Sequence, residues 1–458
     1  MDHRYKYDTR ETEHFILRMA PHEMIIYGDR VMELLEEAQE TLDAKYGWTR
    51  EEPTLVEIFA EQQDFAIRTF GELGGAGYLG VCFGTVVTMN SPNGAGVTSW
   101  NNWEATLWHE YCHVVTLSVT KNRMPRWLSE GISVYEERQR HPAWGQRMNR
   151  AFRGRLLGEG LTPIEELSSA FRNVETGEDL MFAYYQSSLV VEFLMETVGI
   201  PGMRRILQGL AVGMRVEKAM GEVVGKWREF EEHFVEYARG EAEAYGGLAD
   251  WEEPLFQPET MEEVEAYVRE HPASLWGIQS LHQRYVEAGK WDDAMNAARS
   301  LISLFPDDVE EGCGYQRLAF AAREGGDEET ERWAMQEWAK RKGDALPLDE
   351  KLMSWAFEEE DWKGTVQHAE RQLAVNPFLK RAHWCRGCAA SELGKHAVAA
   401  RSFGRLLALG PENPAEVRYR MAEALREEKP EEARKALVEA LVEAPRYLEA
   451  HEMLLELQ

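Results

Sequence analysis

Apolar and polar residues alternate with two different periods along the first hundred residues. Short apolar runs at His14–Met19, Thr54–Phe59 and Thr85–Met89 are typical of β-strands. From Val31 to Leu42, apolar residues recur every three or four positions, which places them along one face of an amphipathic helix. No G-K-[ST] follows the glycines between residues 71 and 84, so this stretch is interpreted as a flexible connection and not as a phosphate-binding loop.

The pattern changes near residue 250. The stretch Gly246–Pro258 is rich in glycine and proline, which interrupt a helix, and the chain after it is helical almost throughout. Pro377, Pro411 and Pro445 lie 34 residues apart, with small or apolar residues at fixed distances before them. A small residue lets two helices approach closely and a proline ends the second helix, so the pattern predicts a helical repeat.

This period resembles that of tetratricopeptide repeats over roughly residues 259–458. The clearest unit is His271–Pro306, with Gly289 at the turn between its helices, and we expect four to five and a half repeats. The concave side of such a solenoid commonly binds peptides or partner proteins. The alternative is that the repeats only pack against the first domain.

Composition narrows the possible classes of function. The 458 residues include 51 basic and 80 acidic side chains, and the formal net charge is -29. Such a surface repels phosphate backbones and anionic lipids, which argues against a nucleic-acid or membrane-surface role. No apolar run approaches the ~20 residues of a membrane span, and the start, Met1–Arg10, lacks the apolar core of a signal peptide. We therefore expect a cytoplasmic protein, or an exported or periplasmic one if a targeting segment has been removed.

Residues 109 to 113 form the pattern H-E-x-x-H. His109 and His113 are four residues apart, so on a helix both imidazoles reach one metal ion, and Glu110 leans toward the side of a metal-bound water. The segment is predicted to be a helix that Asn101 or Asn102 caps and that ends near residue 121. The alternative is two surface histidines on a helix.

A second motif, W-L-S-E-G at residues 127 to 131, follows shortly after. A helix that carries Glu130 inward supplies a third ligand. Two neutral nitrogens and one carboxylate leave the fourth position of zinc open for water, which is the arrangement of a catalytic site. We therefore predict one zinc ion (Zn2+) per chain, held by His109, His113 and Glu130.

The form H-E-x-x-H, then W-L-x-E-G-x-x-x-Y-x-E, resembles the gluzincin metallopeptidases, the thermolysin-like branch of the peptidase MA-like enzymes. It is most similar to the aminopeptidases and to bacterial peptidase-like domains that carry tetratricopeptide repeats. The resemblance implies an α+β zincin-like metallopeptidase domain, with a small mixed sheet and a helical subdomain, followed by an all-α repeat solenoid. The expected limits are 1–250 for the peptidase domain (strand-rich 1–98, helical 99–245), 251–258 for a linker and 259–458 for the repeats.

The resemblance also implies residues that assist the zinc ion. In the aminopeptidase branch, a Y-x-K-G-A segment brings a tyrosine to the oxyanion, and Tyr184 falls on that tyrosine, with Tyr185 as the adjacent rival. The branch also carries G-x-M-E-N, whose Glu grips the free amino terminus of the substrate, but the corresponding stretch Gly84–Pro92 contains no Glu. Exopeptidase action is thus disfavoured. This strand is expected to lie along an extended substrate, or to be an ordinary sheet strand.

The predicted function is zinc-dependent hydrolysis of peptide bonds by an endopeptidase whose repeats recruit a protein substrate or partner. Zinc would polarise the scissile carbonyl and lower the pKa of its water toward ~7. Glu110 would move the proton, and Tyr184 would share the oxyanion with the metal. Two alternatives stay open: a protein-binding repeat scaffold with an inactive zinc domain, and a hydrolase that acts on another amide or ester.

Overall fold

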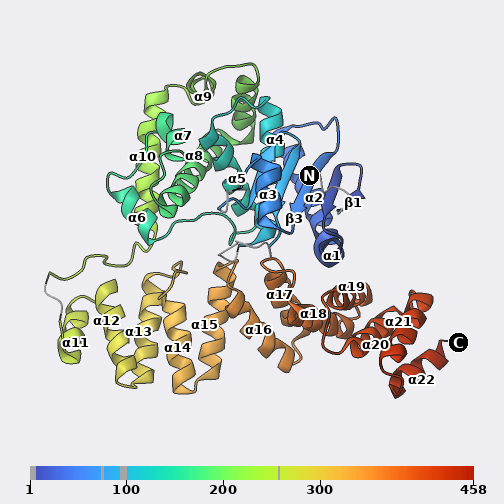
Figure 1. The fold of residues 1–458 in the computed structure, drawn as a ribbon. Coiled ribbons are helices and arrows are strands. Elements are labelled where there is room, and N and C mark those ends of the chain that lie inside the picture. The colour runs from blue at the N-terminus through green and yellow to red at the C-terminus, as the bar shows by residue number, and fades with distance from the viewer. Residues whose placement is uncertain (1–6, 74–76, 93–100, 256–257, 458) are drawn as a thin grey trace. The chain divides into compact units, whose positions relative to one another are not determined.

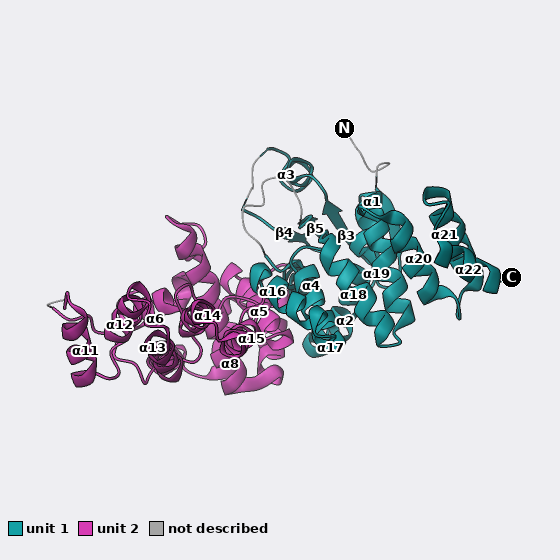
Figure 2. Ribbon diagram, turned by 90° about the horizontal axis from the view of Figure 1, so that it is seen from below, with its two compact units in different colours: residues 1–118, 344–458 teal, residues 119–343 magenta. Residues whose placement is uncertain are grey.

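The structure is a computed structural model, and it describes residues 7–73, 77–92, 101–255 and 258–457 (Figure 1). By packing, the chain divides into two compact units, shown in two colours in Figure 2.

The first unit combines two segments that are far apart in the sequence. It contains Met1–Ser118 and Asp344–Gln458, and the second unit contains Val119–Gly343. This division follows packing and does not test the predicted domain limits near residues 250 and 259, which stay predictions.

A mixed sheet lies in the first unit. Its strands are β1 Asp8–Glu11, β2 Phe15–Met19, β3 Thr54–Phe59, β4 Gly80–Phe83 and β5 Val86–Asn90. The order is β1-β2-β3-β5-β4. The three inner strands β2, β3 and β5 run parallel, whereas β1 and β4 pair antiparallel with their neighbours.

The three predicted strands are confirmed to within one residue at each end. The pattern does not predict β1 and β4. Because β4 lies inside the glycine-rich stretch, the interpretation of that stretch as a flexible connection is wrong for residues 80–83. A strand of four residues is too short to show alternation, and Gly80 weakens its local preference, so pairing with β5 determines this strand.

Helices pack on both faces of the sheet (Figure 1). The helices of this part are α1 Pro21–Glu23, η2 Met24–Gly28, α2 Asp29–Tyr46, α3 Gln62–Phe70 and α4 Trp103–Thr120. On one face, the ring of Tyr111 in α4 meets the ring of Phe15 in β2 edge-on, with centroids 5.4 Å apart. On the opposite face, the hydroxyls of Thr69 in α3 and Thr88 in β5 are hydrogen-bonded at 3.0 Å.

The first unit also contains repeat helices. They are α16 Leu346–Glu358, α17 Trp362–Leu373, α18 Lys380–Glu392, α19 His396–Ala408, α20 Pro414–Leu425, α21 Pro430–Glu443 and α22 Leu448–Glu456. Each packs against the next along the chain. Alanines and Phe403 fill the space between successive helices, as the predicted small positions require.

The turn between α17 and α18 holds the start of α4. The backbone N–H of Trp103 donates to the carbonyl oxygen of Ala374 at 3.0 Å. Its indole N–H donates to the carbonyl oxygen of Leu373 at 2.9 Å. The ring of Tyr27 also meets that of Phe378, with centroids 5.7 Å apart. The first N–H groups of a helix lack partners within the helix, and here a repeat supplies one. Part of the repeat segment therefore packs on the sheet-bearing segment.

The second unit is helical. Its helices are α5 Arg126–Arg140, α6 Arg150–Leu157, η3 Ile164–Glu166, α7 Leu167–Ala170, α8 Gly177–Ala211, α9 Val216–Val224, α10 Trp227–Ala244, α11 Met261–Glu270, α12 Leu275–Glu287, α13 Trp291–Leu304, α14 Gly314–Gly325 and α15 Glu328–Arg341. The predicted unit His271–Pro306 is confirmed as α12 and α13, with Gly289 at φ 67 between them. The turn between α13 and α14 binds the start of α6. The backbone N–H of Arg150 donates to Glu310 at 2.7 Å, and the guanidinium of Arg150 pairs with Asp308.

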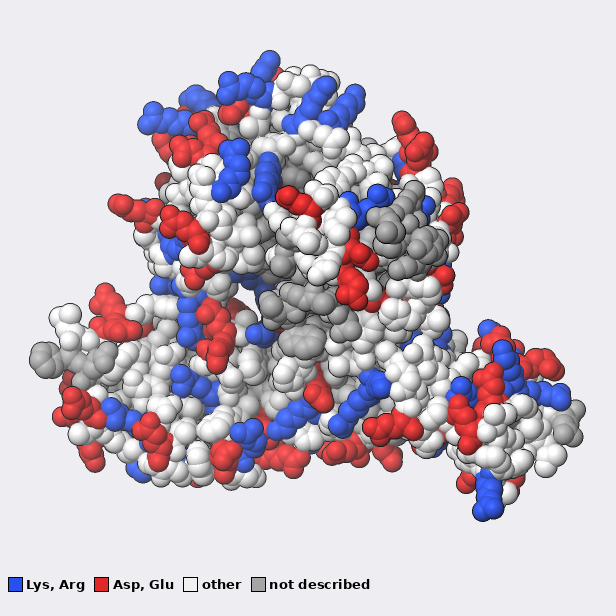
Figure 3. All heavy atoms as spheres, in the orientation of Figure 1, with Lys and Arg blue, Asp and Glu red and all other residues white. Residues whose placement is uncertain are grey.

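Acidic and basic side chains are interspersed over the face drawn in Figure 3. Among the residues that the structure describes, no helix combines the length and the apolar character that a bilayer crossing requires.

Candidate metal centre

The helix that carries H-E-x-x-H begins and ends where the sequence predicts. The side chain of Asn102 accepts a hydrogen bond from the backbone N–H of Ala105 at 3.1 Å, so Asn102 is the N-cap of α4. After Thr120, Lys121 and Asn122 adopt positive φ angles of 53 and 57, which end the helix. Asn102 is one of the two caps that the sequence proposes.

Three potential ligands gather at this helix and the next. The rings of His109 and His113 have centroids 4.7 Å apart. One ligand atom each of His109, His113 and Glu130 lies within 4.8 Å of the others. The connection from α4 to α5 is short, residues 121–125, and Glu130 lies in the second turn of α5. A possible His-His-Glu metal site therefore exists, and its donor set is one of those that hold catalytic zinc in proteins.

Glu110 lies under the edge strand β4. It is 6% exposed. A Cβ atom built on Gly80 would lie 2.7 Å from Cγ and 2.9 Å from Oε1 of Glu110, closer than real Cβ contacts come. The absence of a side chain at Gly80 thus leaves room for the Glu110 carboxylate. The closeness of Gly80 to Glu110 could not be predicted from the sequence, because Gly80 is one of several glycines in the stretch between residues 71 and 84.

A buried polar network fixes α4 to α2. The hydroxyl of Tyr111, within the H-E-x-x-H segment, donates to Asp43 at 2.6 Å and also contacts Arg50. Burial, followed by the hydrogen bond to Asp43, raises the pKa of Tyr111 well above its usual range. The phenol therefore stays protonated and serves as a donor. This network positions the helix.

Within the second unit, Glu130 lies in a cluster that also contains Tyr184. Arg126 donates from Nε to Oε1 of Glu130 at 3.2 Å, and its guanidinium carbon is 4.9 Å from the centre of the Phe171 ring. The ring of Phe171 meets that of Tyr184 at 5.1 Å and nearly a right angle. The sequence proposes Glu130 and Tyr184 but gives no sign of Arg126 or Phe171.

Close contact between α5 and α8 brings these side chains together. A Cβ atom on Gly131 would lie only 2.5 Å from the carbonyl oxygen of Ser187, so a glycine after Glu130 lets the two helices touch. Tyr185, the rival of Tyr184, is 4% exposed and stacks on Phe152 at 5.1 Å. Tyr185 is therefore a core residue.

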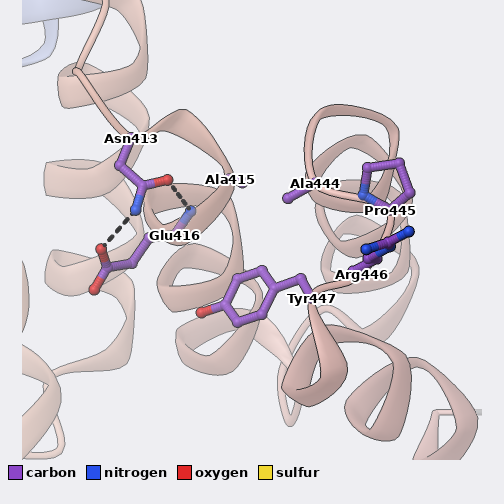
Figure 4. Close-up of a pocket in the computed structure, with 7 residues that line it drawn as sticks. All are labelled: Asn413, Ala415, Glu416, Ala444, Pro445, Arg446 and Tyr447. Carbon is purple, nitrogen blue, oxygen red and sulfur yellow. Dashed lines mark hydrogen bonds between the residues drawn. The ribbon is translucent and has the colours of Figure 1, made fainter.

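A separate hollow lies between two successive repeat turns in the first unit (Figure 4). Its volume is about 610 Å³, and the ring of Tyr447 extends from one turn toward the other. The lining residues are Asn413, Ala415, Glu416, Ala444, Pro445, Arg446 and Tyr447. The hollow combines an aromatic ring, two alanines and both signs of charge.

Comparison with models of protein families gives a match over part of the chain. Residues 38–231 match the Peptidase MA superfamily. The matched segment includes both helices that carry the candidate ligands, as well as Tyr184. No curated protein sequence matches the chain.

Several solved structures resemble the chain weakly. YrrB, described as a TPR protein with an unusual peptide-binding site, is 13% identical, with a TM-score of 0.30, and the match covers 42% of this chain and 98% of YrrB. MamA is 16% identical, with a TM-score of 0.27 and coverage of 36% and 88%. Yeast Tom70 is 10% identical, with a TM-score of 0.23 and coverage of 94% of both chains.

Proposed function

We propose that this protein is a zinc-dependent endopeptidase of the gluzincin type, with a zincin-like domain followed by tetratricopeptide repeats. The observation that carries the proposal is the donor set of His109, His113 and Glu130 within 4.8 Å, next to the buried carboxylate of Glu110. Two imidazoles and one carboxylate fit zinc and leave a coordination position open. The match of residues 38–231 to the Peptidase MA superfamily supports the same reaction class.

The protein's own residues divide the work of hydrolysis. When bound, zinc supplies Lewis-acid activation of the water and of the scissile carbonyl. Glu110 accepts the proton of the attacking water and returns it to the leaving nitrogen. Tyr184 donates a hydrogen bond to the oxyanion as the carbonyl becomes tetrahedral.

The substrate is proposed to pair with β4 and not with β5. β5 lies between β3 and β4, so the expectation that the Gly84–Pro92 strand runs along a substrate is wrong. The N–H of Asn90 bonds to the carbonyl oxygen of Leu79, and in an antiparallel ladder the bonded residues alternate. The backbone groups of Gly80 and Cys82 therefore point away from β5. A peptide that pairs with them would pass directly over Glu110, at a site that requires no free terminus.

Zinc content tests the proposal. In the parent we expect about one zinc ion per chain by elemental mass spectrometry. Glu130→Ala should lose the metal, whereas Glu110→Gln should keep it and lose hydrolysis of any peptide that the parent cleaves. Glu136→Gln, on the same helix α5 as Glu130, serves as a control for the substitution of a buried glutamate. A parent without zinc after reconstitution, or a full equivalent in Glu130→Ala, would contradict the proposal.

A second candidate function is protein binding by the repeats, as a scaffold or to recruit a substrate. The hollow around Tyr447 supports it, because it presents an aromatic ring and charged groups between two turns. The zinc experiment separates the candidates, since a protein that never binds zinc leaves the repeats as the functional part.

A further inference from the structure

Arg126 contacts both functional side chains that the second unit contributes. It is the first residue of α5, one helical turn before Glu130. Its side chain is 38% exposed and that of Glu130 is 12% exposed, so the pair lies at the border between solvent and core. The Nε–Oε1 contact of 3.2 Å uses only one part of the guanidinium fork.

The guanidinium also interacts with Tyr184, and both groups contact the ring of Phe171. Burial lowers the pKa of Arg126, but the charge of Glu130, the charge interaction with Tyr184 and the hydrogen bonds with both outweigh it and raise this pKa. The ring of Phe171 packs against both the guanidinium of Arg126 and the ring of Tyr184. An arginine suits this position because its planar fork serves two acceptors at once and stacks on an aromatic face, which a lysine ammonium does not do.

We infer that Arg126 is a positioning residue of the proposed metal centre, which holds the carboxylate of Glu130 and the hydroxyl of Tyr184 in one fixed arrangement. This inference rests on the proposed function. Partners that orient a metal ligand typically contribute 10- to 100-fold in metal affinity. The contact between Nε of Arg126 and Oε1 of Glu130 restricts the rotation of the carboxylate and so orients it.

The alternative is that Arg126 and Glu130 form an ordinary ion pair on the helix surface, which has little effect on stability or metal binding, as is typical of exposed Arg and Glu residues four positions apart. The chain offers a matched control for it. Arg228 and Glu232 in α10 have the same order and spacing, and the same Nε–Oε1 distance of 3.2 Å. Their side chains are 91% and 63% exposed, so that pair lies entirely on the protein surface.

The experiment is a zinc titration of the full chain against a chromophoric chelator. We expect Arg126→Gln to weaken zinc binding by about 10- to 100-fold. Arg126→Lys, which keeps the charge but not the fork, should fall between Arg126→Gln and the parent, and Arg228→Gln should equal the parent. With cobalt in place of zinc, Arg126→Gln should also change the visible absorption bands, because these report ligand geometry.

The outcomes separate this inference from the proposed function. If the parent binds no zinc, the proposed function fails and the inference with it. If the parent binds one equivalent and Arg126→Gln binds it as tightly, with an unchanged cobalt spectrum, only the inference is overturned. Circular dichroism and the unfolding midpoint of each variant identify a loss that comes from misfolding.

Discussion

A missing side chain at residue 80 determines how near β4 approaches Glu110. The ligand set could be predicted because His109 and His113 lie on one helix at a fixed spacing and Glu130 follows in a short motif. The contact of Gly80 with Glu110 and that of Arg126 with Tyr184 could not be predicted. Their partners Glu110 and Tyr184 lie 30 and 58 residues away, and sequence spacing does not encode neighbours in space at such distances.

Gly80→Ala should impair catalysis without removing the metal. The added methyl group would come within 2.7 Å of the Glu110 side chain and force it aside. We expect about a 100-fold loss of kcat/KM on any peptide that the parent cleaves, at the lower end of the ~10²- to 10⁴-fold that general acid–base catalysis contributes, with unchanged zinc content. Gly77→Ala is the matched control, because nothing lies within 4 Å of a Cβ atom there. Equal losses in both variants would show that the clash with Glu110 is not the cause.

At the scale of the elements, the repeats carry a recurring hydrogen bond. His383 bonds to the carbonyl oxygen of Pro377 at 2.8 Å, and His451, two repeats later, bonds to that of Pro445 at 3.0 Å. The spacing of the prolines predicts the 34-residue period of the repeats, and the apolar runs predict the three inner strands of the sheet. The two outer strands could not be predicted, because they are ordered by pairing with a neighbouring strand, and a short strand at an edge shows little pattern of its own.

The stability of the repeats should depend on pH through His383. Burial lowers the pKa of His383 to about 4, against 6.5 for a free imidazole. Between these values the unfolded chain binds a proton that the folded chain does not, so the free energy of unfolding falls as the pH drops from 6.5 toward 4. At pH 5 the loss should be about 2 kcal/mol relative to pH 7.5.

Urea unfolding at pH 7.5 and pH 5 measures this loss. His383→Gln keeps an N–H donor for Pro377 but has no group that titrates, so the difference between the two pH values should shrink by about 2 kcal/mol. His451→Gln is the control, since that ring is exposed. An unchanged difference in His383→Gln would mean that this imidazole does not govern the pH dependence.

At the scale of the whole molecule, the sheet and the last repeats form one compact unit, although residues 119–343 separate them in the sequence. The sequence predicts the sheet and the repeats as separate domains. Their association could not be predicted, because the contacts of Trp103 with the turn at residues 373–374 are single long-range pairs without any periodic pattern.

A chain that ends at residue 258 tests whether the predicted peptidase domain is independent. Without residues 344–458, Trp103 loses both of its carbonyl acceptors and Tyr27 loses its contact with Phe378. We expect the truncated chain to unfold at a markedly lower temperature than the full chain and to bind zinc substoichiometrically. Cooperative unfolding at the same temperature, with one zinc ion bound, would instead establish the limit near residue 250 as an independent boundary.

The division of the first unit between both ends of the sequence also has a consequence for its synthesis on the ribosome. The sheet and α4 emerge first, but the turn that accepts the hydrogen bonds of Trp103 emerges only after residues 119–343 have been made. At ~5–20 residues per second this takes about 10 to 45 s. During that time the nascent H-E-x-x-H helix lacks its support, so stable capture of the metal would follow translation of the last repeats and not accompany that of the motif itself.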